Sequence, residues 1–123
     1  AGTGAGGAGD GTGAGGSGSG AGGGGGIAVR PSVQSGRIDS ARDYPVPPGG
    51  REVRFGTSVT VIFTVTTDGR ARDCSVYRPG PDPETNRLTC QLVTQRIRFN
   101  PARNEAGEPV EARYAWRQDF SAR

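Results

Sequence analysis

Cys74 and Cys90 are the two cysteines of the chain, and they offer its main route to covalent chemistry. A disulfide between them would close a loop of about 15 residues and stabilise the fold by about 3 kcal/mol. The alternative is a pair of buried reduced thiols. Cys74 lies in a predicted hairpin and Cys90 in the predicted helix beyond it, where the hairpin needs a cover. This placement favours the disulfide.

The chain lacks the residues that other kinds of catalysis require. The chain has no histidine, no G-x-S-x-G motif and no paired carboxylates with an evident shared pocket, so acid–base and nucleophilic mechanisms have no candidate groups. Two cysteines without histidine do not make a zinc site. We therefore predict a protein that is not an enzyme and holds no metal or cofactor. Asp68 is interpreted as a turn residue.

Residues 1–26 form a glycine-rich tract that holds 16 of the 23 glycines. Such a tract offers almost no apolar surface to offset the entropy of ordering it. The hexapeptide Gly-Thr-Gly-Ala-Gly-Gly occurs twice and matches G-x-G-x-x-G, but a dinucleotide site needs a strand before this motif and a helix after it. We expect a disordered flexible linker over residues 1–26 and an extended lead-in over 27–39.

Residues 58–77 contain two β-branched runs joined at an Asp-Gly step, which is the pattern of a β-hairpin. In the first run, apolar residues alternate with mostly polar ones, and the apolar set is Val59, Val61, Phe63 and Val65. One face of this strand is therefore expected in a core. An isolated hairpin is marginally stable in water, so the rest of the chain must cover that face.

Residues 82–97 carry the signals of an amphipathic helix. Asp82 suits the N-cap, Pro83 suits the first turn, and Glu84 favours the positive end of the helix dipole. Pro101 blocks any continuation of the helix. The apolar residues at helical spacing are Leu88, Leu92 and Ile97, flanked by Cys90 and Val93.

Residues 110–120 alternate between apolar and charged side chains and predict a third strand. Its apolar side includes the aromatic residues Tyr114, Trp116 and Phe120. We expect this aromatic face to pack with Phe63 beneath the helix. Trp116 is therefore interpreted as a core residue rather than as part of a ligand site.

The order of these elements predicts an α+β domain. Two strands, a helix and a returning strand give a small three-stranded antiparallel sheet with one main helix packed on one face. Before the hairpin, the run Tyr-Pro-Val-Pro-Pro at 44–48 opposes regular structure, so any helix there must be a short one within residues 50–55. Such an open sheet leaves unpaired backbone groups along both of its edges.

Four segments together resemble the C-terminal domain of TonB proteins. They are Arg-Asp-Tyr-Pro at 42–45, Val-Thr-Val-Ile-Phe-Thr-Val-Thr-Thr-Asp-Gly-Arg at 59–70, Arg-Ile-Arg-Phe-Asn-Pro-Ala at 96–102 and Gly-Glu-Pro-Val at 107–110. The cysteine pair, the glycine-rich lead and a basic set made of arginine alone resemble TonB proteins of GC-rich alphaproteobacteria. The resemblance spans about residues 35–120, and we assign residues 40–123 to the TonB-like domain.

The resemblance implies a periplasmic energy transducer for nutrient uptake. TonB proteins are anchored in the inner membrane by an N-terminal helix and work with ExbB and ExbD. They bind the TonB box of outer-membrane receptors that import siderophores, cobalamin or sugars. This chain has no apolar run of the ~18 residues that a spanning helix needs, so we interpret it as a C-terminal fragment of such a protein.

The resemblance also implies the partner-binding residues. The TonB box adds as an extended strand beside the last strand of the sheet, and a second contact region precedes the Tyr-Pro motif. The corresponding residues are Val110, Glu111, Ala112, Arg113, Tyr114, Ala115, Trp116 and Arg117 in the strand, and Ser40, Ala41, Arg42, Asp43 and Tyr44 before the hairpin. The second set lacks the glutamine of enterobacterial TonB, which points to a different receptor selectivity.

Charge does not indicate a nucleic-acid site. All 15 arginines and 11 of the 12 acidic residues follow the glycine-rich tract, so the net charge of the domain is +4, spread along its length. We interpret these arginines as a solvated surface. The alternative function is a periplasmic adaptor or scaffold that binds envelope proteins or peptidoglycan without transmitting force. The exposed sheet edges also leave homodimerisation open.

Overall fold

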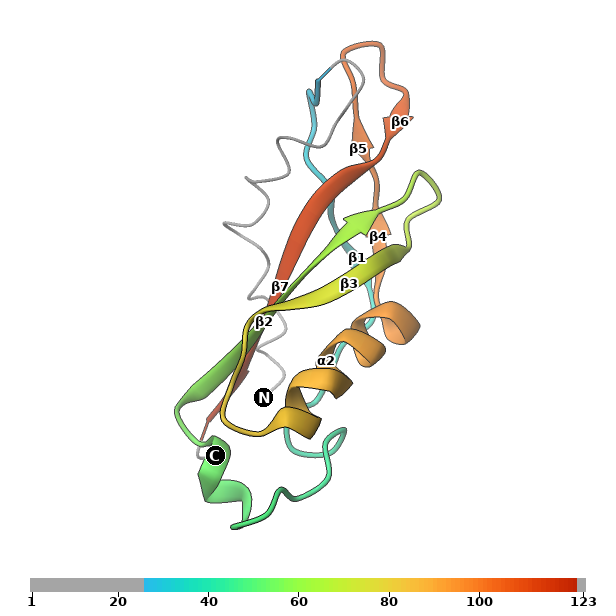
Figure 1. The fold of residues 1–123 in the computed structure, drawn as a ribbon. Helices are drawn as coiled ribbons and strands as arrows, with labels where there is room; N and C mark the ends of the chain where they lie inside the picture. The colour runs from blue at the N-terminus through green and yellow to red at the C-terminus, as the bar shows by residue number, and fades with distance from the viewer. Residues whose placement is uncertain (1–25, 122–123) are drawn as a thin grey trace.

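The computed structural model describes residues 26–121 of the chain. The predicted glycine-rich linker lies, up to residue 25, outside the described residues. Within the described part, a three-stranded antiparallel sheet has one α-helix packed on one face, which confirms the predicted architecture (Figure 1). The strands of this sheet, in spatial order, are β3 (Ala71–Arg78), β2 (Thr57–Val65) and β7 (Ala112–Phe120), and the helix is α2 (Pro83–Arg96).

The predicted hairpin is confirmed as β2 and β3. Thr66 N–H donates to the Arg70 carbonyl (2.8 Å) and Gly69 N–H donates to the Thr66 carbonyl (2.9 Å), so backbone hydrogen bonds close the turn. Gly69 has a φ of 84°, a conformation that glycine adopts without a steric penalty. Along β2, alternate residues from Val59 to Val65 are buried, as the sequence pattern predicts.

The two sides of the sheet differ in regularity. β2 and β7 pair in a continuous register, from Thr57 opposite Phe120 to Val65 opposite Ala112. The pairing of β2 with β3 contains two register shifts, and Asp73 in β3 has a left-handed φ of 57°. Extra residues in one strand disturb the ladder and bend that strand. The sheet is therefore regular at β7 and irregular at β3.

The predicted strand over residues 110–120 divides into two elements. Its first residue belongs to β6 (Pro109–Val110), which pairs with β5 (Ala102–Arg103), and β7 begins only at Ala112. A turn around Gly107, with a φ of 82°, closes the β5–β6 hairpin. The chain changes its strand partner between β6 and β7, which the unbroken alternation of side chains did not reveal.

The predicted boundaries and cross-link of α2 are confirmed. Asp82 caps the start of the helix, because its Oδ2 accepts a hydrogen bond from Thr85 N–H (3.0 Å). At the other end, Ile97 N–H still donates to a helix carbonyl, after which the backbone becomes extended. A disulfide between Cys74 and Cys90 joins β3 to α2, so the alternative of two reduced thiols is wrong.

The buried side of α2 is more polar than predicted. Leu92 and Val93 are buried, whereas Leu88 is only partly buried. Two threonines, Thr85 and Thr89, complete the buried side. Thr89 Oγ1 donates to the Thr85 carbonyl (2.9 Å), so the hydroxyl keeps a hydrogen-bond partner away from water.

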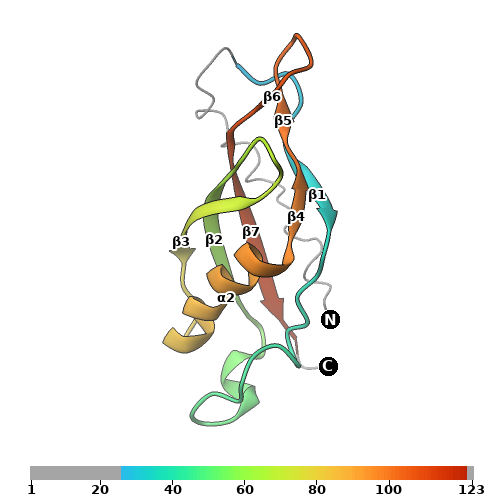
Figure 2. The ribbon, with the colours of Figure 1, turned by 90° about the vertical axis from the view of Figure 1, so that its right-hand side faces the viewer.

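A two-stranded ribbon that was not predicted covers the sheet beside the helix. β1 (Ser32–Ser35) pairs antiparallel with β4 (Arg98–Asn100), and Figure 2 shows this ribbon next to α2. The ring of Phe99 in β4 lies 5.3 Å from that of Phe63 and 5.6 Å from that of Tyr114. The aromatic residues of the sheet are therefore covered by β4 as well as by α2.

The hydrophobic core lies between the sheet and this cover. Trp116 is 1% exposed, which confirms that it is a core residue. Its indole N–H donates to Gln118 Oε1 (2.9 Å), a polar contact inside the core. The buried residues of the core are Ile38, Tyr44, Val59, Val61, Phe63, Val65, Ala71, Leu92, Val93, Ile97, Phe99, Tyr114, Trp116 and Phe120.

Candidate functional site

The free side of β7 is the candidate partner site. β2 lies at the centre of the sheet, so β7 and β3 each have one side without a neighbouring strand in the sheet. Among residues 26–121, β7 pairs only with β2. We call the side of β7 that faces away from β2 the outer edge. An unpaired row of backbone donors and acceptors is a template for another extended chain.

The hairpin determines which backbone groups face the outer edge. Thr66 N–H points across the hairpin, because it donates to the Arg70 carbonyl. Successive residues in a strand direct their N–H and C=O groups to opposite sides, so Phe63 of β2 directs its groups to β7. Its partner Tyr114 therefore directs its groups back to β2. The residues of β7 with outward backbone groups are Arg113, Ala115, Arg117 and Asp119.

The opposite edge of the sheet, on β3, is less suited to strand addition. Its two register shifts interrupt the even spacing of backbone groups, and one of them lies at Asp73. Cys74, the next residue, is fixed to α2 by the disulfide. Irregularity of this kind is one way in which proteins prevent unwanted pairing at an edge.

The side chains of β7 separate the predicted site residues into two groups. One group is buried on the core face, where it holds the strand in place, and consists of Ala112, Tyr114 and Trp116. The other group has its side chains on the opposite face of the sheet, and consists of Arg113, Ala115 and Arg117; of these, Ala115 is also buried, at 8% exposed. Val110 and Glu111 precede β7 and lie beyond its pairing with β2.

Most charged side chains near this strand are paired. Arg72 of β3 makes two hydrogen bonds of 2.9 Å to the Glu111 carboxylate, and Arg117 Nε donates to Asp119 at 2.9 Å. Arg113 Nη1 lies 3.5 Å from the hydroxyl of Thr64. Among residues 26–121, Arg113 has no carboxylate within ion-pair distance.

The second predicted contact segment, residues 40–44, forms a turn ordered by a neighbouring carboxylate. Asp39 Oδ1 accepts hydrogen bonds from the N–H groups of Arg42 (2.9 Å) and Ala41 (2.8 Å). These bonds, with that from Arg42 as the larger cause, lower the pKa of the Asp39 carboxyl. The side chains of Ala41 and Arg42 are exposed and accessible to a partner.

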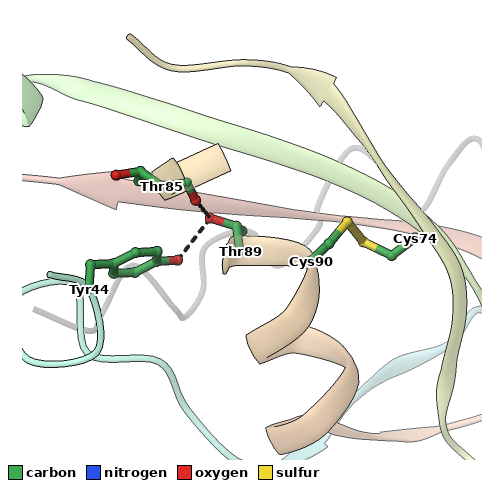
Figure 3. The surroundings of a disulfide bond; sticks show 5 residues. All are labelled: Tyr44, Cys74, Thr85, Thr89 and Cys90. Carbon is green, nitrogen blue, oxygen red and sulfur yellow. Dashed lines mark hydrogen bonds between the residues drawn. A yellow bond between two sulfur atoms is a disulfide. The ribbon is translucent and has the colours of Figure 1, made fainter. Parts of the chain in front are cut away.

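Tyr44 fixes this turn beside the end of β7. Its side chain is 3% exposed, and its ring lies 5.1 Å from the ring of Phe120, the last residue of β7. Its hydroxyl lies 2.9 Å from Thr89 Oγ1 in α2 (Figure 3). The neighbouring Asp43 forms an ion pair of 2.7 Å with Arg96 at the end of α2. Tyr44 therefore positions the turn from within the core.

Arg54 is a buried residue of this region that the sequence interpretation missed. It ends η2 (Arg51–Arg54), a 3₁₀-helix at the place where only a short helix was predicted, and it is 3% exposed. Its guanidinium lies 5.5 Å from the ring of Tyr44 and 5.2 Å from that of Phe120, and donates to the Pro45 carbonyl at 2.9 Å. Burial lowers the pKa of this guanidinium. An arginine in a charged run carries no sequence signal of burial.

The comparison with protein families gives one result. The model described as Gram-negative bacterial TonB protein C-terminal matches residues 47–121, which run from just before η2 to the end of β7 and contain the whole outer edge. No curated protein matches the chain significantly. Within the described part, no cluster of histidine, cysteine and acidic residues could hold a metal, and no helix is long and apolar enough to span a membrane.

Proposed function

Because the chain belongs to the family of Gram-negative bacterial TonB protein C-terminal domains, we propose that it is the receptor-binding domain of a periplasmic energy transducer. Its partner is the TonB box of an outer-membrane receptor, an extended peptide that adds as a strand to the outer edge of β7. Force reaches the domain from ExbB and ExbD through an inner-membrane anchor and the glycine-rich tract at residues 1–26. This force drives nutrient uptake by the receptor.

One observation carries the proposal, namely the unpaired and regular outer edge. Over nine residues β7 keeps a continuous register with β2, and within the described part no strand pairs with its other side. Strand addition takes its affinity from backbone hydrogen bonds and therefore tolerates different partner sequences. Such tolerance suits a domain that serves more than one receptor.

The turn at residues 40–44 supports a second contact in this proposal. Tyr44 packs against Phe120, so the exposed side chains of Ala41 and Arg42 lie near the C-terminal end of β7. A peptide that follows the outer edge past Asp119 would reach this turn. The proposed contact surface therefore consists of backbone groups along β7 and side chains of the turn at its end.

The affinity is expected to be modest. Four to six backbone hydrogen bonds contribute about 1 kcal/mol each, and ordering a flexible peptide offsets part of this gain. We expect a dissociation constant in the micromolar range, which corresponds to about 8 kcal/mol or less.

The test is an NMR titration of the ¹⁵N-labelled domain with extended peptides from outer-membrane receptors of the source organism. We expect the amide signals of Arg113, Ala115, Arg117 and Asp119 to shift most. Shifts confined to residues 60–66 or to α2, with β7 silent, would refute this site. Concentration-dependent shifts of β7 without peptide would show instead that a second copy of the domain occupies the edge.

A proline substitution on each edge separates the two candidate sides of the sheet. Ala115→Pro removes an outward N–H, and proline is tolerated on an edge strand when its nitrogen faces away from the neighbouring strand. We expect this variant to stay folded and to lose peptide binding. Val76→Pro, on the β3 edge, is the matched control and should bind the peptide as the unchanged domain does.

A further inference from the structure

We infer that the strand added to β7 carries an acidic side chain directly across from Ala115, on the sheet face that points away from α2. This inference rests on the proposed function and specifies the chemistry of its partner. It follows from the pattern of charge along the outer edge.

Two arginines flank Ala115 on the same face of the sheet. Arg113 is paired in register with Thr64 and Arg117 with Thr60, and Ala115 lies between them opposite Ile62. Alternation along the strand puts all three side chains on the face away from α2. The core face of β7 is filled by buried residues and has no place for a charge.

The positive charge of this pair is only partly neutralised. Arg117 has Asp119 as its partner, but that ion pair is exposed, with 62% of the arginine side chain and 44% of the aspartate side chain accessible. Exposed pairs of this kind contribute little energy and are screened by water and salt. Arg113 has no carboxylate partner within the described part of the chain, and Glu111 nearby is held by Arg72. A carboxylate would therefore find one available guanidinium and a second that is loosely held.

The geometry of an added strand brings a carboxylate between the two arginines. A residue across from Ala115 projects its side chain to the same face as that of Ala115. Its diagonal neighbours on β7 are Arg113 and Arg117, at roughly 7–8 Å between backbone positions, which long side chains can span. Ala115 contributes only a methyl group, which is 8% exposed, so the longer side chains of Arg113 and Arg117 extend beyond it on both sides of this position. An arginine there would meet repulsion from both sides.

The test uses a receptor-derived peptide whose acidic residues have been replaced by their amides. A single glutamate is then placed at each position in turn, and the dissociation constant is measured for each peptide. We expect the peptide with glutamate at one position to bind tightest, by about three- to tenfold over the peptide without glutamate, since opposite charges across neighbouring strands attract each other. A spin label at the peptide end checks that this position lies across from Ala115.

Substitutions in the domain identify the side chains that interact with the glutamate of the peptide. In Arg113→Gln and Arg117→Gln, the advantage of the glutamate peptide should shrink, and in the double variant it should vanish. Arg78→Gln, on the β3 edge, is the matched control and should keep the full advantage. Circular dichroism and thermal unfolding of each variant confirm that the fold is retained.

The outcomes separate this inference from the proposed function. Equal binding of all glutamate positions, with β7 amides still shifting, would overturn the acidic preference and leave strand addition intact. A loss of the advantage in Arg78→Gln equal to that in Arg113→Gln would show attraction to the net charge of the domain, which also overturns the inference. Absence of β7 shifts with every peptide would remove both proposals.

Discussion

The hydroxyl of Tyr44 donates a hydrogen bond to Thr89 Oγ1 across 2.9 Å in the interior of the domain. The direction of this bond follows from the next one, because Thr89 Oγ1 donates its own hydrogen to the Thr85 carbonyl (Figure 3). A phenolate at Tyr44 could not donate, and its charge would be buried. This hydrogen bond connects the turn before η2 to the middle of α2. It forms only while the Tyr44 hydroxyl is protonated.

Stability should fall in the alkaline range through Tyr44. Burial raises the pKa of this phenol to about 12 from its ordinary value of 10.0. Below pH 10 both the folded and the unfolded chain keep the proton, so the contribution is fully present. As the pH rises from 10 to 12, only the unfolded chain ionises, and about 2–3 kcal/mol of stability should be lost.

Urea unfolding of the domain and of Tyr44→Phe between pH 9 and pH 12 checks this prediction. The variant lacks the ionising group, so the difference in unfolding free energy between the two proteins should narrow as the pH rises. A constant difference across this range would contradict the raised pKa.

Trp116→Ala should destabilise the domain by about 3–5 kcal/mol, because it opens a cavity in the core and leaves Gln118 Oε1 without its donor. The matched control is Arg117→Ala, the next residue on the exposed face, which should cost less than about 1 kcal/mol. Chemical denaturation of both variants gives the two values. Equal losses would mean that the two faces of β7 are not divided as described.

Reduction of the Cys74–Cys90 disulfide should lower the unfolding free energy by about 2–4 kcal/mol. The comparison is between oxidised protein, protein held reduced, and the Cys74→Ala/Cys90→Ala variant, all measured by denaturant unfolding. The reduced and double-variant forms should agree closely. Two titratable thiols in native protein kept free of reductant would contradict the cross-link itself.

Gly69→Ala should be more damaging than Gly107→Ala, although both glycines have left-handed backbones, with φ of 84° and 82°. A Cβ at Gly69 would lie 2.4 Å from the Phe99 carbonyl oxygen, whereas a Cβ at Gly107 would meet nothing within 4 Å. The second variant reports the backbone strain alone, about 1–2 kcal/mol. The excess loss in the first measures the close approach of the hairpin turn to β4, and thermal unfolding of the two should show it.

The sequence predicts the elements that have strong local signals. The Asp-Gly turn and the β-branched alternation identify β2 and β3, and Asp82 with Pro83 identifies the start of α2. The strands β1, β4, β5 and β6 have two to four residues each, which is too short for a period of two to be visible. The pairing of β1 with β4 also joins segments that are far apart in the chain, as between Val33 and Phe99.

The candidate edge illustrates a further limit of sequence reasoning. Alternation predicts that Trp116 is buried, and the structure agrees, whereas Ala115 is buried although it lies on the other face of the sheet. Alternation does not predict which backbone N–H groups are free, because that depends on the register with β2 and on the hairpin bond from Thr66 to Arg70. Only with the register known does Arg113, rather than Tyr114, become the residue with an outward N–H. The burial of Arg54 was likewise invisible, since it depends on two distant aromatic rings.

The continuous pairing of β2 with β7 has a mechanical consequence. A strand bound along the outer edge and pulled parallel to its own length would load its hydrogen bonds in shear, so that many of them must break together. Pulled from one end at a right angle, the same bonds would open singly, like a zipper. β7 is held by nine successive residue pairs with β2 and by a core that includes Trp116. The domain should therefore stay folded while force is transmitted to the bound strand. A weak equilibrium affinity for the bound strand is then compatible with high resistance to force applied along the strand.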